Sequence, residues 1–170
     1  SRESLLKNIK EELKKEYVSI TPFSSILVAD DPKFQLLSSK NYAKKLLNIE
    51  KIFKQDFSKN KRHKKIKIGY LSSDFHHHAT SHLIRDLFEK QNNQKFDYYC
   101  FSYGKLDNSE VSKRIKKSFK NFYTVNERSD YEIASMLKDL EIDIIVDLKG
   151  HTNNNRLKIL SYRPCPIQIS

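Results

Sequence analysis

Glycine is scarce in this chain: only 3 of its 170 residues are glycine, and none are spaced as in Gly-x-Gly-x-x-Gly. That turn brings the pyrophosphate of a dinucleotide close to the backbone at the start of a helix. Its absence argues against binding of NAD or FAD in the usual manner.

Cysteines and long apolar runs are also few. The 2 cysteines are Cys100, in a strand-like run, and Cys165, between two prolines, and they form no Cys-x-x-Cys pair. This excludes a disulfide framework and favours two structural thiols. The longest apolar runs, such as residues 144–146, are far too short to span a bilayer, and nothing resembles a signal peptide. We therefore expect a cytoplasmic protein that makes no membrane contact.

Arginine is rare among the basic residues. The formal net charge is +11, from 32 basic and 21 acidic residues, but 25 of the basic residues are Lys and 7 are Arg. Arg is the usual bidentate partner of phosphates and bases, so most of this charge is interpreted as a solvated surface. The alternative is a basic module that binds nucleic acid or another polyanion.

Residues 1–55 predict a helical segment that precedes the main domain. Apolar residues recur at four-residue spacing from Leu5 to Leu13, which is typical of a helix with one apolar stripe. Residues 17–28 look irregular, with Pro22 as a breaker.

A second, longer helix is expected to begin after Asp31, with Asp31 as its cap and Pro32 at its first position. Its apolar residues extend to Phe53. Residues 56–65 are polar and strongly basic, and we interpret them as a solvated linker.

Residues 66–170 alternate between strand-like and helix-like patterns. Strands are expected at 66–70, 96–103, 122–125, 142–148 and 167–169, with helices near 83–88, 111–119, 133–140 and 157–160. Such alternation predicts an α/β fold: a Rossmann-like parallel sheet with helices on both faces, preceded by two helices. The 38% of hydrophobic residues suffice for one core.

Two loops that leave strand ends are rich in polar groups: residues 72–82 and residues 147–156. In an open parallel sheet, ligands bind beyond the carboxyl ends of the strands. The presence of both loops at such ends is better evidence for a site than either loop alone.

The first loop holds 4 of the 6 histidines. His78 and His82 would share a helix face and thus form part of a metal site, but too few Cys or carboxylate ligands accompany them, and we expect no metal. The other interpretations are acid–base or phosphate-contact chemistry by histidine, and accidental clustering. Thr80 or Ser81 is expected to cap the following helix. Asp74 either orients a histidine or only satisfies the turn.

In the second loop, Gly150 suits a turn that needs positive φ. His151 and Thr152 would then lie at the mouth of the cleft. Arg156 is a candidate anion contact, and a surface ion pair is equally plausible.

Three ordered motifs resemble the O-linked N-acetylglucosamine transferase family, which includes SPINDLY-like proteins and bacterial homologues with tetratricopeptide repeats (glycosyltransferase family 41). Residues 68–82 resemble its strand–Ser-x-Asp-Phe-x-x-His-x-x-x-His pattern, residues 142–152 its second cleft loop, and residues 163–168 its Arg-Pro-Ala-Pro-Ile-Gln segment. Three motifs in the same order are a strong signal.

The resemblance implies the N-terminal half of a GT-B glycosyltransferase, with the active site between two Rossmann-like halves. Such enzymes transfer N-acetylglucosamine, or fucose in SPINDLY-like members, from a nucleotide sugar such as UDP-GlcNAc to Ser or Thr of proteins. The reaction inverts the anomeric centre and needs no metal or cofactor.

By position, the resemblance places His78 at the active-site histidine, with either proton handling or contact with the donor phosphate as its role. It places Thr80, Ser81 and His82, and then Gly150, His151 and Thr152, along the substrate walls. Asp130 stands in a region where a second histidine is absent, and it is carried as a possible supporting residue together with Asp74.

The family continues beyond the position of Ser170 into a second half that carries most donor contacts. We therefore expect the isolated chain to be an incomplete and inactive transferase. A non-catalytic scaffold member of the family is the remaining alternative.

Overall fold

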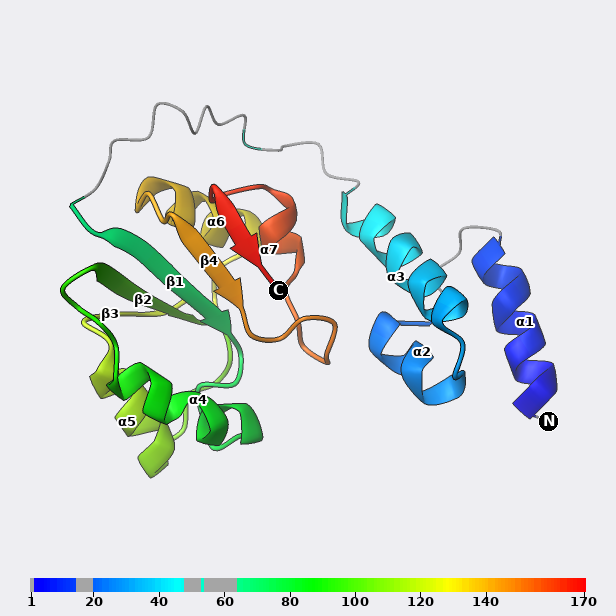
Figure 1. Cartoon of the computed structure of the whole chain (residues 1–170), viewed down its shortest axis with the longest axis horizontal. Coiled ribbons are helices and arrows are strands. Elements are labelled where there is room, and N and C mark those ends of the chain that lie inside the picture. The colour runs from blue at the N-terminus through cyan, green and yellow to red at the C-terminus, as the bar shows by residue number, and fades with distance from the viewer. Residues whose placement is uncertain (1, 15–19, 48–52, 54–63) are drawn as a thin grey trace. The chain divides into compact units, whose positions relative to one another are not determined.

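The computed structural model describes residues 2–14, 20–47, 53 and 64–170. The chain divides into two compact units, Ser1–Lys51 and Ile52–Ser170, and each is described by itself (Figure 1). Most of the basic linker predicted at residues 56–65 lies outside the described residues.

The described residues of the first unit form three helices, where the sequence predicts two: α1 (Arg2–Lys14), α2 (Pro22–Val28) and α3 (Pro32–Leu47). The interpretation of Pro22 as a breaker was wrong. Pro22 instead begins α2, because a helix start needs no backbone N–H from its first residue. Thr21 caps this helix, and its Oγ1 accepts a hydrogen bond of 3.2 Å from the backbone N–H of Ser24.

Helix α3 begins as predicted. Asp31 Oδ1 accepts hydrogen bonds from the backbone N–H groups of Lys33 at 3.0 Å and Phe34 at 3.2 Å. Ala29 and Phe34 form the buried centre of this unit, with partly buried apolar side chains packed around them: Leu6, Ile9, Ile20, Val28 and Leu37.

Phe53 corrects a second prediction, because it is not helical and belongs to the second unit. Its backbone N–H donates to the carbonyl oxygen of Tyr162 at 3.0 Å. Its ring centroid lies 5.6 Å from that of Tyr131 and 6.3 Å from that of Tyr162, and Lys138 Nζ lies 5.0 Å from it. The aromatic surface beneath Phe53 is built by residues far along the chain, which helical spacing alone does not reveal.

The second unit is an α/β domain with a fully parallel five-stranded sheet in the order β3-β2-β1-β4-β5. The strands are β1 (Ile66–Ser72), β2 (Phe96–Ser102), β3 (Asn121–Thr124), β4 (Ile144–Asp147) and β5 (Ile167–Ile169). The predicted Rossmann-like sheet is therefore confirmed. The chain moves outward from β1 to β3, then crosses to the other side of β1 for β4, so the direction of strand order reverses between β1 and β4.

Helices cover both faces of this sheet (Figure 1). Helices α4 (Ala79–Glu89) and α5 (Glu110–Ser118) lie on one face, and α6 (Asp130–Asp139) and α7 (Lys158–Ser161) on the other. Ser109 caps α5, as the sequence predicts, and of the two residues that the sequence offers as caps of α6, Ser129 and Asp130, the structure shows Ser129. None of the helices in the described segments is long and apolar enough to cross a membrane.

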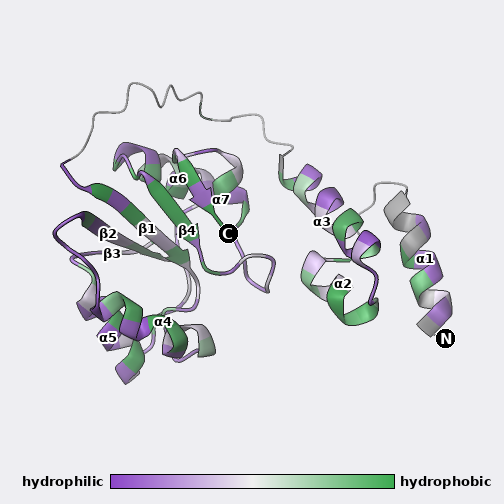
Figure 2. Ribbon diagram, in the orientation of Figure 1, coloured by the Kyte–Doolittle hydropathy of each residue, from purple (hydrophilic) through white to green (hydrophobic). Residues whose placement is uncertain are grey.

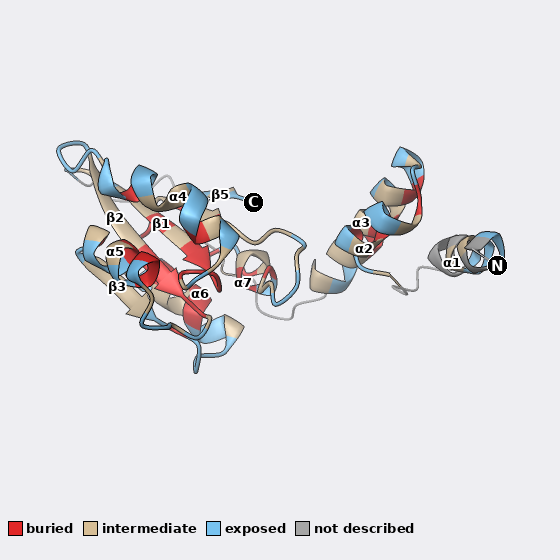
Figure 3. Cartoon of the chain, turned by 90° about the horizontal axis from the view of Figure 1, so that it is seen from below, coloured by how far each residue is buried: buried red, intermediate tan, exposed pale blue. Residues whose placement is uncertain are grey.

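The core lies between the sheet and these helices. On the α4–α5 face, a buried cluster joins residues of β2, the two helices and the loop after β1: Phe75, Phe88, Cys100, Val111, Ile115 and Phe119. Apolar residues line the strands in Figure 2, and buried residues gather at the sheet and the inner sides of the helices in Figure 3. This packing fixes the strand ends from which the candidate site is built.

Candidate active site

The candidate site lies at the carboxyl ends of β1 and β4, where the strand order reverses. Leu71 of β1 is paired with Asp147 of β4, and Ser72 of β1 with Ser102 of β2. The two polar loops predicted from the sequence therefore leave neighbouring strand ends. In open α/β sheets, this reversal point is the place where ligands bind.

A glycine lets the loop after β2 approach the loop after β1. A Cβ atom at Gly104 would lie 2.0 Å from the carbonyl oxygen of Ser73, so no side chain fits there. The backbone N–H of Tyr103 also donates to the carbonyl oxygen of Ser72 at 3.1 Å. Backbone contacts alone therefore hold the loop that carries Asp74 against the loop after β2.

Asp74 forms a buried ion pair with Lys149. Lys149 Nζ lies 3.1 Å from Asp74 Oδ1 and 2.9 Å from Oδ2, and the side chains of Lys149 and Asp74 are 9% and 7% exposed. Ser73 Oγ donates a further hydrogen bond of 2.7 Å to Oδ1. Burial alone would raise the pKa of Asp74, but the hydrogen bonds from Ser73 and Lys149, with the charges of Lys149 and His78, lower it below its ordinary value.

Sequence reasoning singled out Asp74 but missed Lys149. The available signal was the position of Lys149 at the end of a buried strand, where a solvated lysine is not expected. The partner could not be read from the sequence, because 75 positions separate the two residues.

His78 caps helix α4, a role that had been predicted for Thr80 or Ser81. Its backbone is extended, with φ −144° and ψ 151°, and its Nδ1 accepts a hydrogen bond of 3.2 Å from the backbone N–H of Thr80. The ring nitrogen replaces the oxygen of the usual cap residues. Ser81 is instead buried, and its hydroxyl donates to the carbonyl oxygen of Asp74.

The structure brings His78, and not His82, beside Asp74. His78 Nδ1 lies 3.6 Å from Asp74 Oδ2, and the His78 side chain is 41% exposed. The rings form two separate pairs: His78 lies 5.6 Å from His76, and His82 lies 5.1 Å from His77. Within the described part of the chain, no three His, Cys, Asp or Glu side chains gather as a metal ion would require.

Asp147 organises the second loop from the end of β4. Its buried carboxylate accepts hydrogen bonds from the backbone N–H of Gly150 at 2.7 Å and from Ser170 Oγ at 2.9 Å, both at Oδ2. Gly150 has φ +53°, the left-handed conformation predicted for it. Thr152 Oγ1 donates to the carbonyl oxygen of Lys149 at 2.7 Å, and His151 is exposed. Thr152 thus holds the loop closed, while His151 faces solvent.

Arg156 and Asp130 bind each other. Arg156 Nε lies 2.6 Å from Asp130 Oδ1, and its Nη2 donates to the carbonyl oxygen of Arg128 at 2.7 Å. The guanidinium also lies 5.7 Å from the centroid of the Tyr103 ring. Of the two interpretations of Arg156, the structure shows the ion pair.

The phenol of Tyr103 is influenced by the carboxylates of both polar loops, Asp74 in the first and Asp147 in the second. Burial raises the pKa of its phenol, and the carboxylates of Asp147 and Asp74 raise it further, while the nearby Arg156 lowers it. The phenol therefore remains protonated throughout the neutral range and acts as a neutral group in this site.

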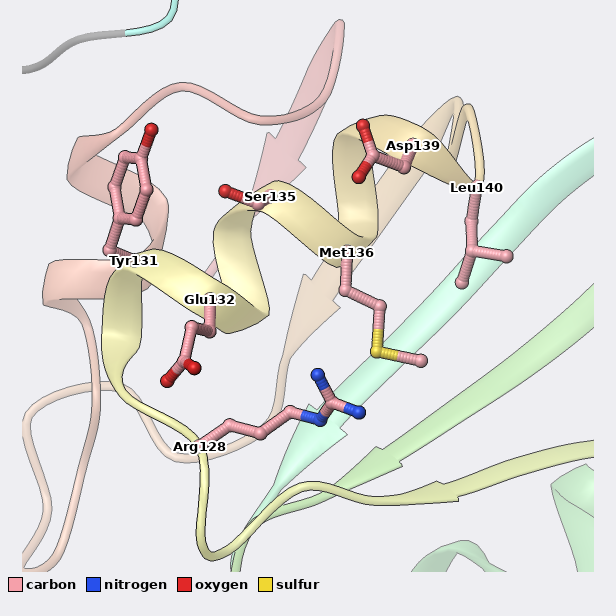
Figure 4. Close-up of a pocket in the computed structure, with 7 residues that line it drawn as sticks. All are labelled: Arg128, Tyr131, Glu132, Ser135, Met136, Asp139 and Leu140. Carbon is pink, nitrogen blue, oxygen red and sulfur yellow. The ribbon is translucent and has the colours of Figure 1, made fainter.

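A hollow lies on the outer side of α6 and contains none of the predicted site residues (Figure 4). Its lining comes from α6 and the residues beside it: Arg128, Tyr131, Glu132, Ser135, Met136, Asp139 and Leu140. In Figure 4, Arg128 extends along the helix towards Met136. The convergence of buried charge at β1 and β4 distinguishes the candidate active site from this hollow.

The model of glycosyl transferase family 41 matches residues 2–170. The chain belongs to glycosyltransferase family 41. The resemblance drawn from the three motifs is therefore confirmed.

Two plant relatives show how much of a family member is present. The chain is 30% identical over 161 residues to the probable UDP-N-acetylglucosamine–peptide N-acetylglucosaminyltransferase SEC of Arabidopsis thaliana, covering 89% of this chain and 16% of the relative. It is 33% identical over 111 residues to the SPINDLY protein of the same plant, covering 62% of this chain and 12% of the relative. The chain thus spans less than a fifth of either relative.

A solved structure shares the fold. A mutant of the Thermobaculum terrenum O-GlcNAc transferase matches with a TM-score of 0.69 and 23% identity, over 81% of this chain and 26% of that one. The Rossmann-like arrangement is therefore also found in a solved transferase structure.

Proposed function

We propose that this chain forms one wall of the active site of an enzyme that transfers N-acetylglucosamine, or a related sugar such as fucose, from a nucleotide sugar to Ser or Thr of proteins. The observation that carries the proposal is the meeting of residues 72–82 and 147–152 at the strand-order reversal, in a chain of family 41. The names of the Arabidopsis relatives specify a UDP-N-acetylglucosamine donor and a peptide acceptor. We take both as the substrates here.

The proposed reaction is an inverting displacement that uses neither a metal nor a cofactor. In it, His78 is the side chain of this wall that touches the reacting groups, because it is partly exposed and stands beside the buried Asp74. Thr80, His82 and residues 150–152 complete the wall, with the buried Ser81 holding the first loop through the Asp74 carbonyl and Gly150 giving the second loop its turn. This arrangement supplies positioning and polar contacts, which are the main protein contributions to group transfer.

The remaining wall is proposed to come from a second α/β half of the enzyme, which supplies most donor contacts. This fits the small share of each relative that the chain covers, 16% and 12%. The 170-residue chain by itself is then expected to lack robust transferase activity. We place the complete enzyme in the cytoplasm, with an acceptor protein as its partner.

A mutation in the complete enzyme tests the role of His78. Replacement His78→Ala is expected to reduce transfer to an acceptor peptide by roughly 100-fold, the usual contribution of a positioned acid–base or charge-stabilising group. Lys113→Ala, on the exposed side of α5, is the matched surface control and should leave transfer unchanged. The assay follows labelled sugar from UDP-N-acetylglucosamine to peptide, with and without EDTA.

Three results would contradict parts of the proposal. Unchanged turnover in His78→Ala would remove this residue from the mechanism, and loss of activity in EDTA would remove the metal-free reaction. Donor-dependent glycosylation by the 170-residue chain alone would show that the second wall is not needed.

A further inference from the structure

The Nδ1 atom of His78 has two competing partners. It accepts a hydrogen bond from the backbone N–H of Thr80 at 3.2 Å, and it faces Asp74 Oδ2 at 3.6 Å. The first contact needs a lone pair on Nδ1, and the second would need a proton there. At 3.6 Å the second contact is too long to be a hydrogen bond.

The choice between these partners decides what the other ring nitrogen offers. A neutral imidazole carries one proton, so a lone pair on Nδ1 places the proton on Nε2. His78 then presents an N–H donor to a ligand. If Nδ1 instead donated to Asp74, as histidine does to aspartate in a Ser-His-Asp triad, Nε2 would present a lone pair and could accept a proton.

Lys149 favours the Thr80 contact of His78 Nδ1, because its ammonium pairs with the Asp74 carboxylate and neutralises it. Its ammonium contacts both carboxylate oxygens, at 3.1 and 2.9 Å, and Ser73 Oγ donates to Oδ1 at 2.7 Å. The lysine and aspartate side chains are both more than nine-tenths buried. A neutralised carboxylate attracts a proton to Nδ1 far less than a bare one, especially where water does not screen the charge.

We propose that Lys149 is a positioning residue that keeps the proton of neutral His78 on Nε2, so that His78 acts as a hydrogen-bond donor to the ligand and not as a general base. The donor role rests on the proposed function, and the tautomer does not. A donor at this place suits a negatively charged oxygen, such as one of a nucleotide-sugar diphosphate, since charge-assisted hydrogen bonds are the stronger ones.

Nitrogen NMR of the 170-residue chain tests the tautomer directly. The chain is labelled with ¹⁵N-histidine and recorded near pH 8.5, where ordinary histidines are neutral, and the His78 signals are assigned by their loss in His78→Gln. The wild type is expected to show a protonated Nε2 and an unprotonated Nδ1. In Lys149→Met, and in the more polar Lys149→Gln, the proton is expected to move to Nδ1 in most molecules.

Two controls separate charge from general disturbance of the loop. Lys149→Arg keeps the cation and should keep the proton on Nε2, and Lys113→Met removes a surface charge and should change nothing. A wild-type spectrum with the proton on Nδ1 would overturn the inference, even if no variant folds. So would a folded Lys149→Met or Lys149→Gln chain that keeps the wild-type tautomer.

The outcome is independent of the transferase assay. If the complete enzyme proves inactive while the tautomer follows Lys149, the proposed function and the donor role fail, and the control of the His78 tautomer by Lys149 stands. If transfer occurs but the tautomer ignores Lys149, only the inference fails.

Discussion

Asp74 and Lys149 stand 75 positions apart in the sequence, yet each buries more than nine-tenths of its side chain against the other's loop. Removing either partner would leave a charge without water and without a counter-charge. A buried pair of this kind is costly to break, even where forming it adds little net stability.

The variant Asp74→Asn should lower the free energy of unfolding by about 3 kcal/mol at pH 7, because Lys149 would remain buried and unpaired. The pKa of Asp74 is lowered in the native state, so its stabilising effect is present above the ordinary aspartate pKa near 4 and is lost as the pH falls further. The difference between wild type and variant should therefore narrow below about pH 4. Urea unfolding at a series of pH values measures this difference in the free energy of unfolding.

Asp86→Asn is the matched control for this measurement. Asp86 is 64% exposed and pairs with Arg114 at 3.2 Å, so its loss should cost less than about 1 kcal/mol. An equal cost for the two variants at pH 7, or a difference that does not depend on pH, would contradict the account of the buried pair.

At the scale of elements, helix α6 shows local sequence and structure in full agreement. Ser129 Oγ accepts from the backbone N–H of Glu132 at 3.3 Å, and the Glu132 carboxylate accepts from the backbone N–H of Ser129 at 2.7 Å. This reciprocal arrangement is a capping box. It fixes the start of the helix that presents Asp130 to Arg156.

Ser129→Ala should destabilise the second unit by about 1 kcal/mol, since it leaves a backbone N–H of the first turn without its partner. Circular dichroism during urea unfolding gives the change. Ser118→Ala serves for comparison, because Ser118 Oγ donates back to the carbonyl oxygen of Arg114, at 2.9 Å, a contact that adds little to a helix. Equal urea midpoints of unfolding for the two variants would show that the capping box does not stabilise the fold.

The limits of sequence reasoning are clearest at these helix starts. The caps Asp31 and Ser109 were predicted, and the cap of α6 was narrowed to Ser129 or Asp130, because a side-chain oxygen beside a helical pattern satisfies the first N–H groups. The cap of α4 was mispredicted: His78 is the cap, but Thr80 and Ser81, which follow it, carry the hydroxyl groups usual at that position. Helix α2 was missed because a proline both begins and interrupts helices, and seven residues are too few for a periodic pattern.

At the scale of the whole molecule, the sheet could be predicted and the site only in outline. Strand–helix alternation implies a parallel sheet, and the polar loops follow from the rule that ligands bind at carboxyl strand ends. The contacts of Lys149 with Asp74, and of Arg156 with Asp130, depend on strand order and register, which local patterns do not encode.

Residues 52–170 should fold without the first 51 residues, because they form a compact unit with a core of their own. Within this shortened chain, Phe53→Ala should cost about 1 kcal/mol, the value of an aromatic contact with Tyr131 and Tyr162. Phe23→Ala in the full chain is a suitable comparison, as that ring belongs to the other unit and is 48% exposed. Thermal unfolding followed by tyrosine absorbance measures each change. A shortened chain without a cooperative transition would contradict the first expectation.

The reactivity of the two buried cysteines reports on local unfolding of the second unit. Burial raises the pKa of the Cys100 thiol far above its ordinary value, and burial together with Asp143 raises that of Cys165 to about 12. Thiol reagents react with the thiolate, so neither cysteine should react while the protein is folded. Cys165 precedes the edge strand β5 and Cys100 lies within β2, so the order in which they react with a disulfide reagent should separate fraying of the sheet edge from unfolding of its centre.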